Sequence, residues 1–121
     1  MSPDPERILE QIVSLEDVIE YGSKIALYTQ TLSLDDFRSN ELVFDAVVRN
    51  LELLGDAAKR VPSTLTASLP DAAWTRAAAF ADVIARHSVT LDRQIVWDLV
   101  KTKIPELVRS SIAALERLRR N

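Results

Sequence analysis

The hydrophobic positions of the first thirty residues recur with the period of a helix. Asp4 followed by Pro5 is a typical helix start, because a short polar side chain can cap the first turn and proline lacks only an N–H that would have no partner there. The apolar residues that follow at helical spacing are Ile8, Ile12, Leu15, Ile19 and Ala26. They predict an amphipathic helix from Asp4 to near Gln30. Gly22 interrupts this pattern, and it is expected to weaken the helix mildly rather than to admit a close neighbour.

A second amphipathic pattern ends at Pro62, a residue that stops a helix. Its apolar positions are Phe44, Val47, Leu51, Leu54, Ala58 and Val61. The stretch between the two patterns, "TLSLDDFRSN" at 31–40, is predicted to be a connector. Within it Ser33 and Asp36 have the spacing of a capping box, with Asp in place of the usual Glu or Gln.

The second half of the chain predicts a third helix and a divided fourth one. The stretch "PSTLTASLPDAAW" at 62–74 contains two prolines and four hydroxyl residues, which is typical of a loop, and it leads to a helix N-cap at Asp71. The third helix carries Trp74 and ends near His87 and Ser88. A last helical region opens at Thr90 or Asp92, and Pro105 is expected to bend it. Its apolar positions are Ile95, Val96, Leu99, Leu107, Val108, Ile112, Leu115 and Leu118.

These patterns predict an all-α fold, an antiparallel bundle of four main helices with the last one bent at a proline. No segment alternates as a strand would, and no repeat is visible. Hydrophobic residues make up 47% of the 121 positions and only two are glycine, which is a globular and helical composition. A chain of this length favours a single domain, residues 1–121.

Composition also limits the chemistry. Without cysteine there is no disulfide or thiolate site. A di-metal bundle needs Glu-x-x-His pairs, but the residue three before His87, the single histidine, is Ile84. The acidic residues Glu16, Asp17 and Glu20 share a helix face, which is most simply a solvated surface. We therefore predict no metal and no cofactor.

The charge pattern indicates where the protein works and what it binds. A net charge of −3 disfavours broad electrostatic capture of nucleic acid, although a local basic patch remains open. No apolar run is long enough to cross a bilayer, and the first residues carry charges where a signal peptide would be apolar. We expect a soluble, cytoplasmic protein with no membrane contact.

Three segments together resemble the HepT-like family, an all-α branch of the HEPN superfamily. They are "AVVRNLELLGDAAKRVP" at 46–62, Trp74, and "IVWDLVKTKIPELVRSSI" at 95–112, and the likeness covers nearly the whole chain. The resemblance implies a symmetric homodimer of HEPN-like bundles that acts as a metal-independent RNA endonuclease, the toxin of a toxin–antitoxin pair. It also implies a partner, a nucleotidyltransferase-type antitoxin that adds adenylate to a tyrosine of the toxin.

The family's active motif is an arginine, four to six intervening residues, a histidine, one residue and a tyrosine. The arginine would hold the scissile phosphate and the histidine would move a proton. When "LDRQIVW" at 91–97 is matched to the family's Ile-Asp-x-x-Ile-Val-Trp, Ala81 falls at the arginine, Arg86 at the histidine and Ser88 at the tyrosine. Asp82 fits the polar residue after the arginine. His87 lies one position away from the histidine.

The candidate site residues are therefore Asp82, Arg86 and His87, with Ser88 at the position that would be modified. His87 either transfers a proton in RNA cleavage or is a polar residue at a helix end, where a positive charge suits the dipole. Arg86 either contacts phosphate or a partner, or is simply solvated. Trp74 is expected in the core or a dimer interface rather than as a platform for stacking bases, and so is Trp97.

Two kinds of function follow. The first is the toxin-side component of a toxin–antitoxin pair, a ribonuclease by resemblance whose motif has changed. The second is a catalytically inactive dimeric interaction module that binds and supports a small nucleotidyltransferase. A free-standing helical dimer without such a partner is a third possibility.

Overall fold

The chain folds into helices only, wherever the structure describes it. The computed structural model describes residues 4–62, 65, 74, 79, 82–83, 86–87 and 92–120. The helices are α1 (Pro5–Thr29), α2 (Leu34–Ser39), α3 (Glu41–Arg60), α6 (Arg93–Lys101) and α7 (Lys103–Arg120). Seven described residues between α3 and α6 are helical as well: Leu65, Trp74, Ala79, Asp82, Val83, Arg86 and His87. The all-α prediction is confirmed.

The first two helix starts follow the capping rules. The Asp4 carboxylate accepts a hydrogen bond from the Glu6 N–H at 3.1 Å, so α1 begins where the sequence predicts. Ser33 and Asp36 form a reciprocal capping box. This box starts a short helix, α2, in a stretch that was predicted only as a connector.

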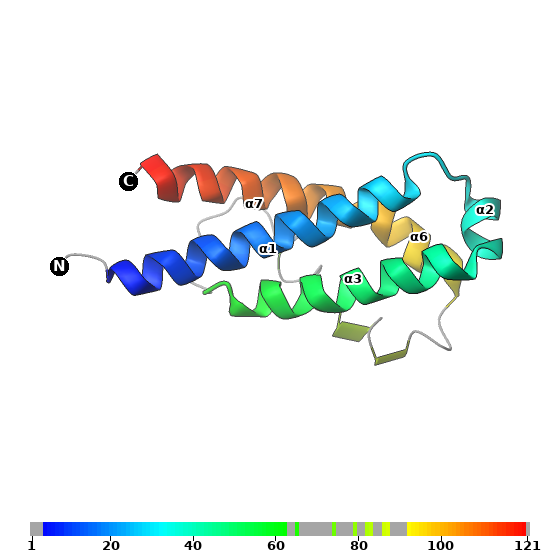
Figure 1. Cartoon of the computed structure of the whole chain (residues 1–121), viewed down its shortest axis with the longest axis horizontal. Helices are drawn as coiled ribbons and strands as arrows, with labels where there is room; N and C mark the ends of the chain where they lie inside the picture. The colour runs from blue at the N-terminus through cyan, green and yellow to red at the C-terminus, as the bar shows by residue number, and fades with distance from the viewer. Residues whose placement is uncertain are drawn as a thin grey trace.

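The central helix of the bundle is α1, which packs against α3 on one side and α7 on the other. Both neighbours run antiparallel to it, so the start of α1 and the end of α7 lie at one end of the bundle and α2 lies at the other (Figure 1). The core between them is apolar. Its largest fully buried side chains are Phe37, Leu15, Ile25, Leu51, Leu54, Ile104, Leu107, Val18, Val47 and Val96.

Two predictions between α3 and α7 need correction. Leu65, in the stretch predicted as a loop, is helical, and its N–H donates to the Pro62 carbonyl at 3.0 Å. The bend in the last helix is confirmed, but the break falls at Thr102, with φ −121° and ψ −68°, rather than at Pro105. A proline ring clashes with the carbonyl four residues earlier, here that of Lys101, so the chain must leave the helix before the proline arrives. Pro105 then lies in the first turn of α7, where its missing N–H costs nothing.

Basic side chains fix α6 to the ends of two other helices. Lys101 donates to the Thr29 carbonyl at 3.0 Å, at the C-terminus of α1. Arg93 donates to the Arg38 carbonyl at 3.1 Å, in the last turn of α2. Cations are favourable at these ends because the last carbonyls of a helix lack partners and carry partial negative charge.

Gly22 has a packing role that the sequence did not predict. It is buried, and a Cβ built on it would clash with the Cγ2 methyl of Val108 on α7 and would lie 3.6 Å from Leu54 and 3.7 Å from Ile104. The helix continues through Gly22 without interruption. Glycine is therefore present because α7 approaches α1 closely at this point.

No helix in the described parts of the chain is both long enough and apolar enough to span a membrane.

We predict that Gly22→Ala destabilises the protein. The added methyl group overpacks the contact with Val108, whose branched side chain has little freedom to move, and such insertions cost about 1–3 kcal/mol, partly offset by alanine's better helix propensity of about 1 kcal/mol. Urea unfolding followed by circular dichroism measures the change. Ser23→Ala, at the neighbouring exposed position, should change the free energy of unfolding by less than about 0.5 kcal/mol.

The cause can be isolated with a double variant. In a Val108→Ala background the clash is gone, so Gly22→Ala should become neutral or stabilising. An equal loss of stability in both backgrounds would show that the α1–α7 contact is not what requires glycine.

Candidate functional site

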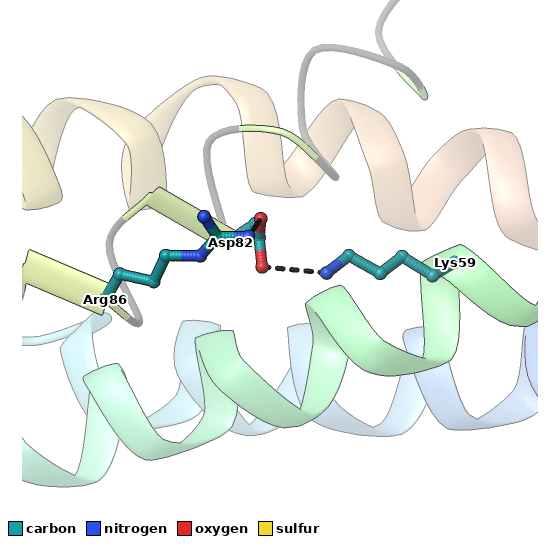
Figure 2. Close-up of polar contacts among 3 residues, drawn as sticks. All are labelled: Lys59, Asp82 and Arg86. Carbon is teal, nitrogen blue, oxygen red and sulfur yellow. Dashed lines mark hydrogen bonds and ion pairs between the residues drawn. The ribbon is translucent and has the colours of Figure 1, made fainter.

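One carboxylate joins two helices at the candidate site. The Lys59 ammonium of α3 donates to Asp82 Oδ1 at 2.7 Å, and the Arg86 guanidinium donates to Asp82 Oδ2 at 2.7 Å. Figure 2 shows Lys59 reaching toward Asp82 from α3, and Arg86 reaching toward Asp82 from the other direction, out of Asp82's own segment. Each oxygen of the carboxylate therefore holds one cation.

Local sequence explains half of this arrangement. Asp82 and Arg86 are four residues apart and helical, so their side chains lie on one helix face. Lys59 lies in the last turn of α3, where a cation is favoured by the helix dipole. The following residue, Arg60, points about 100° further round α3 and pairs with Asp17 of α1 at 3.4 Å. The last turn of α3 thus contacts both of its neighbours through successive cations.

The cations change the acidity of Asp82. The hydrogen bond from Lys59 is the main cause that holds the pKa of the Asp82 carboxyl below its usual value, and the charges of Arg86 and Lys59 act in the same direction. Partial desolvation opposes them, but it does not reverse the shift. Asp82 is thus an ionised anchor at neutral pH and not a proton donor.

Among the predicted site residues, the structure brings Asp82 and Arg86 together. His87 is helical and exposed, but it follows Arg86 and therefore points about 100° away from the face that Arg86 shares with Asp82. The helix was predicted to end near His87 and Ser88; His87 is helical, and the residues from 88 to 91 lie outside the described ones. Ala81 and Ser88 lie outside the described residues, as does the predicted N-cap Asp71.

Sequence reasoning missed Lys59 at this site. Its contact with Asp82 spans 23 positions and two helices, so no local spacing indicates it. The helical periodicity of the stretch 46–62 indicates that Lys59 lies beside the buried face of the helix. It does not indicate which residue Lys59 contacts.

The tryptophans do not form stacking platforms for bases. Trp74 is buried, 3% exposed, within the hydrophobic core, as predicted. Trp97 is partly buried, with its ring centroid 5.2 Å from that of Phe37, and the Lys101 ammonium lies 4.6 Å from its centroid. Both rings are thus engaged in packing within this chain.

The described residues offer no cluster of metal ligands. Within these ranges no three His, Asp or Glu side chains gather closely enough to hold an ion. The chemistry available at the candidate site is that of two fixed cations, one carboxylate and a neighbouring imidazole.

Comparison with known proteins identifies the family. The family model described as "Ribonuclease HepT-like" matches residues 18–113, which include α3, the Asp82–His87 segment and most of α7. The chain belongs to the HepT-like family. The resemblance drawn from the sequence and the predicted HEPN-like fold are therefore confirmed.

Relatives in other organisms carry ribonuclease names. A "Probable ribonuclease HepT" of Thermococcus cleftensis is 30% identical over 93 residues, which cover 77% of this chain and 84% of that protein. A "Putative RNase" of Methanocaldococcus jannaschii is also 30% identical over 93 residues, with 77% of each chain covered. These names belong to the relatives and not to this chain.

Another relative from Methanocaldococcus jannaschii is longer. It is named "Gamma-glutamylcyclotransferase and putative RNase", and it is 28% identical over 109 residues, 90% of this chain. The HepT-like chain spans only 49% of that relative's length. No solved structure matches the chain.

We predict that Asp82 stabilises the fold above its pKa and loses this effect in acid. Its folded pKa lies below the unfolded value of about 3.9, so the stabilisation is present above that value and disappears as the pH falls through the lower, folded pKa. The thermal midpoint of the wild type should exceed that of Asp82→Asn at pH 7 in low salt, and the two midpoints should converge as the pH falls through the lowered, folded pKa of Asp82. Asp17→Asn, which removes a carboxylate with a single, longer ion pair, is the control. A difference between wild type and Asp82→Asn that persists in acid would contradict the ionic origin of the effect.

Proposed function

We propose that this HepT-like chain is the toxin-side component of a toxin–antitoxin pair, a cytoplasmic homodimer that binds RNA and a nucleotidyltransferase-type antitoxin, and that its own RNA cleavage is weak or absent. The observation that carries the proposal is the position and the pairing of Arg86. This residue stands where the family's motif has its histidine, and its guanidinium is held by Asp82.

A guanidinium cannot perform the work of that histidine. Metal-independent RNA cleavage needs a group that takes the proton from the ribose 2′-hydroxyl and a group that gives a proton to the leaving 5′-oxygen. Arginine stays protonated at every accessible pH, so Arg86 can hold a phosphate but cannot accept a proton. Ala81, at the position of the motif arginine, cannot hold a phosphate at all.

Residual cleavage would depend on the remaining groups. Arg86 would hold the phosphate, Asp82 would keep its guanidinium in place, and His87 would transfer the proton. Because His87 points away from the Asp82–Arg86 face, this arrangement requires RNA to pass around the helix rather than along one face of it. The Ser88 hydroxyl is the only group at the tyrosine position that could accept adenylate, and it is shorter and less acidic than a tyrosine.

A second function is supported by the ion pairs themselves. Both carboxylate oxygens of Asp82 accept hydrogen bonds within the chain, one of them from the Arg86 guanidinium. The site can therefore serve as a rigid binding surface instead of a catalytic one. The chain would then be a catalytically inactive dimeric module that presents substrate to a small nucleotidyltransferase. Growth arrest on expression without that partner favours the toxin, and its absence favours the module.

We predict that the unaltered chain cleaves a mixed-sequence RNA slowly or not at all in the presence of EDTA. The variant Ala81→Arg with Arg86→His and Ser88→Tyr should cleave at least about a hundredfold faster, since general acid–base catalysis typically contributes 10²–10⁴-fold. Gel analysis of a labelled RNA measures both rates. Ala81→Arg with Arg86→Gln and Ser88→Tyr lacks the proton-transfer group and should remain inactive.

The opposite pattern would remove the proposal of an altered site. Robust cleavage by the unaltered chain that His87→Ala abolishes would assign the proton transfer to His87 and would make the chain an active ribonuclease.

We also predict a homodimer at micromolar concentration, because a two-fold axis brings two copies of the motif into one cleft. Light scattering coupled to gel filtration should give a mass near twice the 13.5 kDa of the chain. A strict monomer over this concentration range would exclude a cleft shared between two copies.

A further inference from the structure

Asp82 is the only carboxylate in the described parts of the chain that pairs with two cations. The other ion pairs there join one acid to one base, as in Arg60–Asp17 and Arg119–Glu16. Around Asp82, two positive charges and one negative charge leave a local charge of +1 in a protein whose net charge is −3. The summed charge of these three side chains is therefore opposite in sign to the net charge of the chain.

Both cations keep donors for another ligand. An ammonium group has three N–H donors and a guanidinium has five, and Asp82 accepts one hydrogen bond from each. The side chains remain open to solvent, with 51% of Lys59 and 70% of Arg86 exposed. An anion can thus approach without displacing the carboxylate.

We infer that Lys59 and Arg86, aligned by Asp82, form a subsite for one phosphodiester group of RNA, with Lys59 as a phosphate-binding residue. A phosphodiester carries one negative charge, which matches the local charge of +1. The two cations come from different helices and meet at a single carboxylate, so a phosphate bound beside that carboxylate would receive donors from both side chains.

This inference deepens the proposed function, since it rests on RNA binding, and it gives Asp82 a double role. The carboxylate orients both cations in the free protein, which reduces the side-chain entropy lost on binding. Its negative charge also repels the phosphate. Removing its charge should therefore strengthen RNA binding, whereas removing Lys59 should weaken it.

The test measures binding instead of cleavage. The probe is a fluorescein-labelled, single-stranded RNA with 2′-O-methyl groups, which cannot be cut at the ribose hydroxyl, and fluorescence anisotropy gives its Kd over a range of salt concentrations. Lys59→Gln removes the charge, and Lys59→Arg restores it. Arg60→Gln is the matched control, because it removes an equal charge at the next residue, where the partner is Asp17.

Lys59→Gln should weaken binding roughly threefold to tenfold, which is the effect of losing one exposed charge-assisted hydrogen bond. It should also reduce the slope of log K against log salt by about 0.7, the contribution of one phosphate contact on a single strand. Lys59→Arg should bind like the wild type, and Arg60→Gln should lie within twofold of it, roughly the limit of a minor electrostatic effect. Asp82→Asn should bind more tightly than the wild type.

Two results would overturn the inference. The first is an equal effect of Lys59→Gln and Arg60→Gln, which would mean that only overall charge matters. The second is weaker binding by both Lys59→Gln and Asp82→Asn, which would mean that the ion pairs serve the fold of this region alone. If the wild type binds no RNA at low salt, the proposed function fails as well; this result is distinguishable because in the other two the wild type does bind.

Discussion

The burial of one stripe along α1 is the interaction on which the rest of the structure depends. Leu15, Val18 and Ile25 are fully buried, and each such side chain stabilises the fold by roughly 1.5–3 kcal/mol. Gly22 lies in the same stripe and lets α7 approach. Because α3 and α7 both pack on α1, the position of every other element follows from how these two helices meet it.

The candidate site lies at the edge of this packed core, at the last turn of α3, and depends on it. While α3 turns its apolar face to α1, its last turn carries two cations that point to different neighbours, Arg60 to α1 and Lys59 to the segment of Asp82. The phosphate subsite proposed for Lys59 and Arg86 therefore exists only when both helices are docked. The proposed binding of RNA would thus depend on the same turn of α3 that contributes to stability.

In the proposed function, the same ion pairs account for the arginine at the position of the motif histidine. A HepT-like chain whose histidine position is occupied by arginine loses a proton-transfer group and gains a permanent charge. Asp82 compensates that charge and holds it in place. Under the proposed function this exchange preserves the binding of a phosphate and removes cleavage.

The sequence by itself determined the long helices α1 and α3 and the divided last helix, because periodicity, caps and prolines act over a few residues. It placed the start of α1 at Asp4 and the capping box at Ser33, and it carried the family resemblance. It misplaced the bend, because the clash made by Pro105 acts one turn earlier. Only the tertiary structure decided the role of Gly22 and the pairing of Lys59 with Asp82. Both depend on side chains that meet across helices, and contacts of that kind leave no local spacing in the chain.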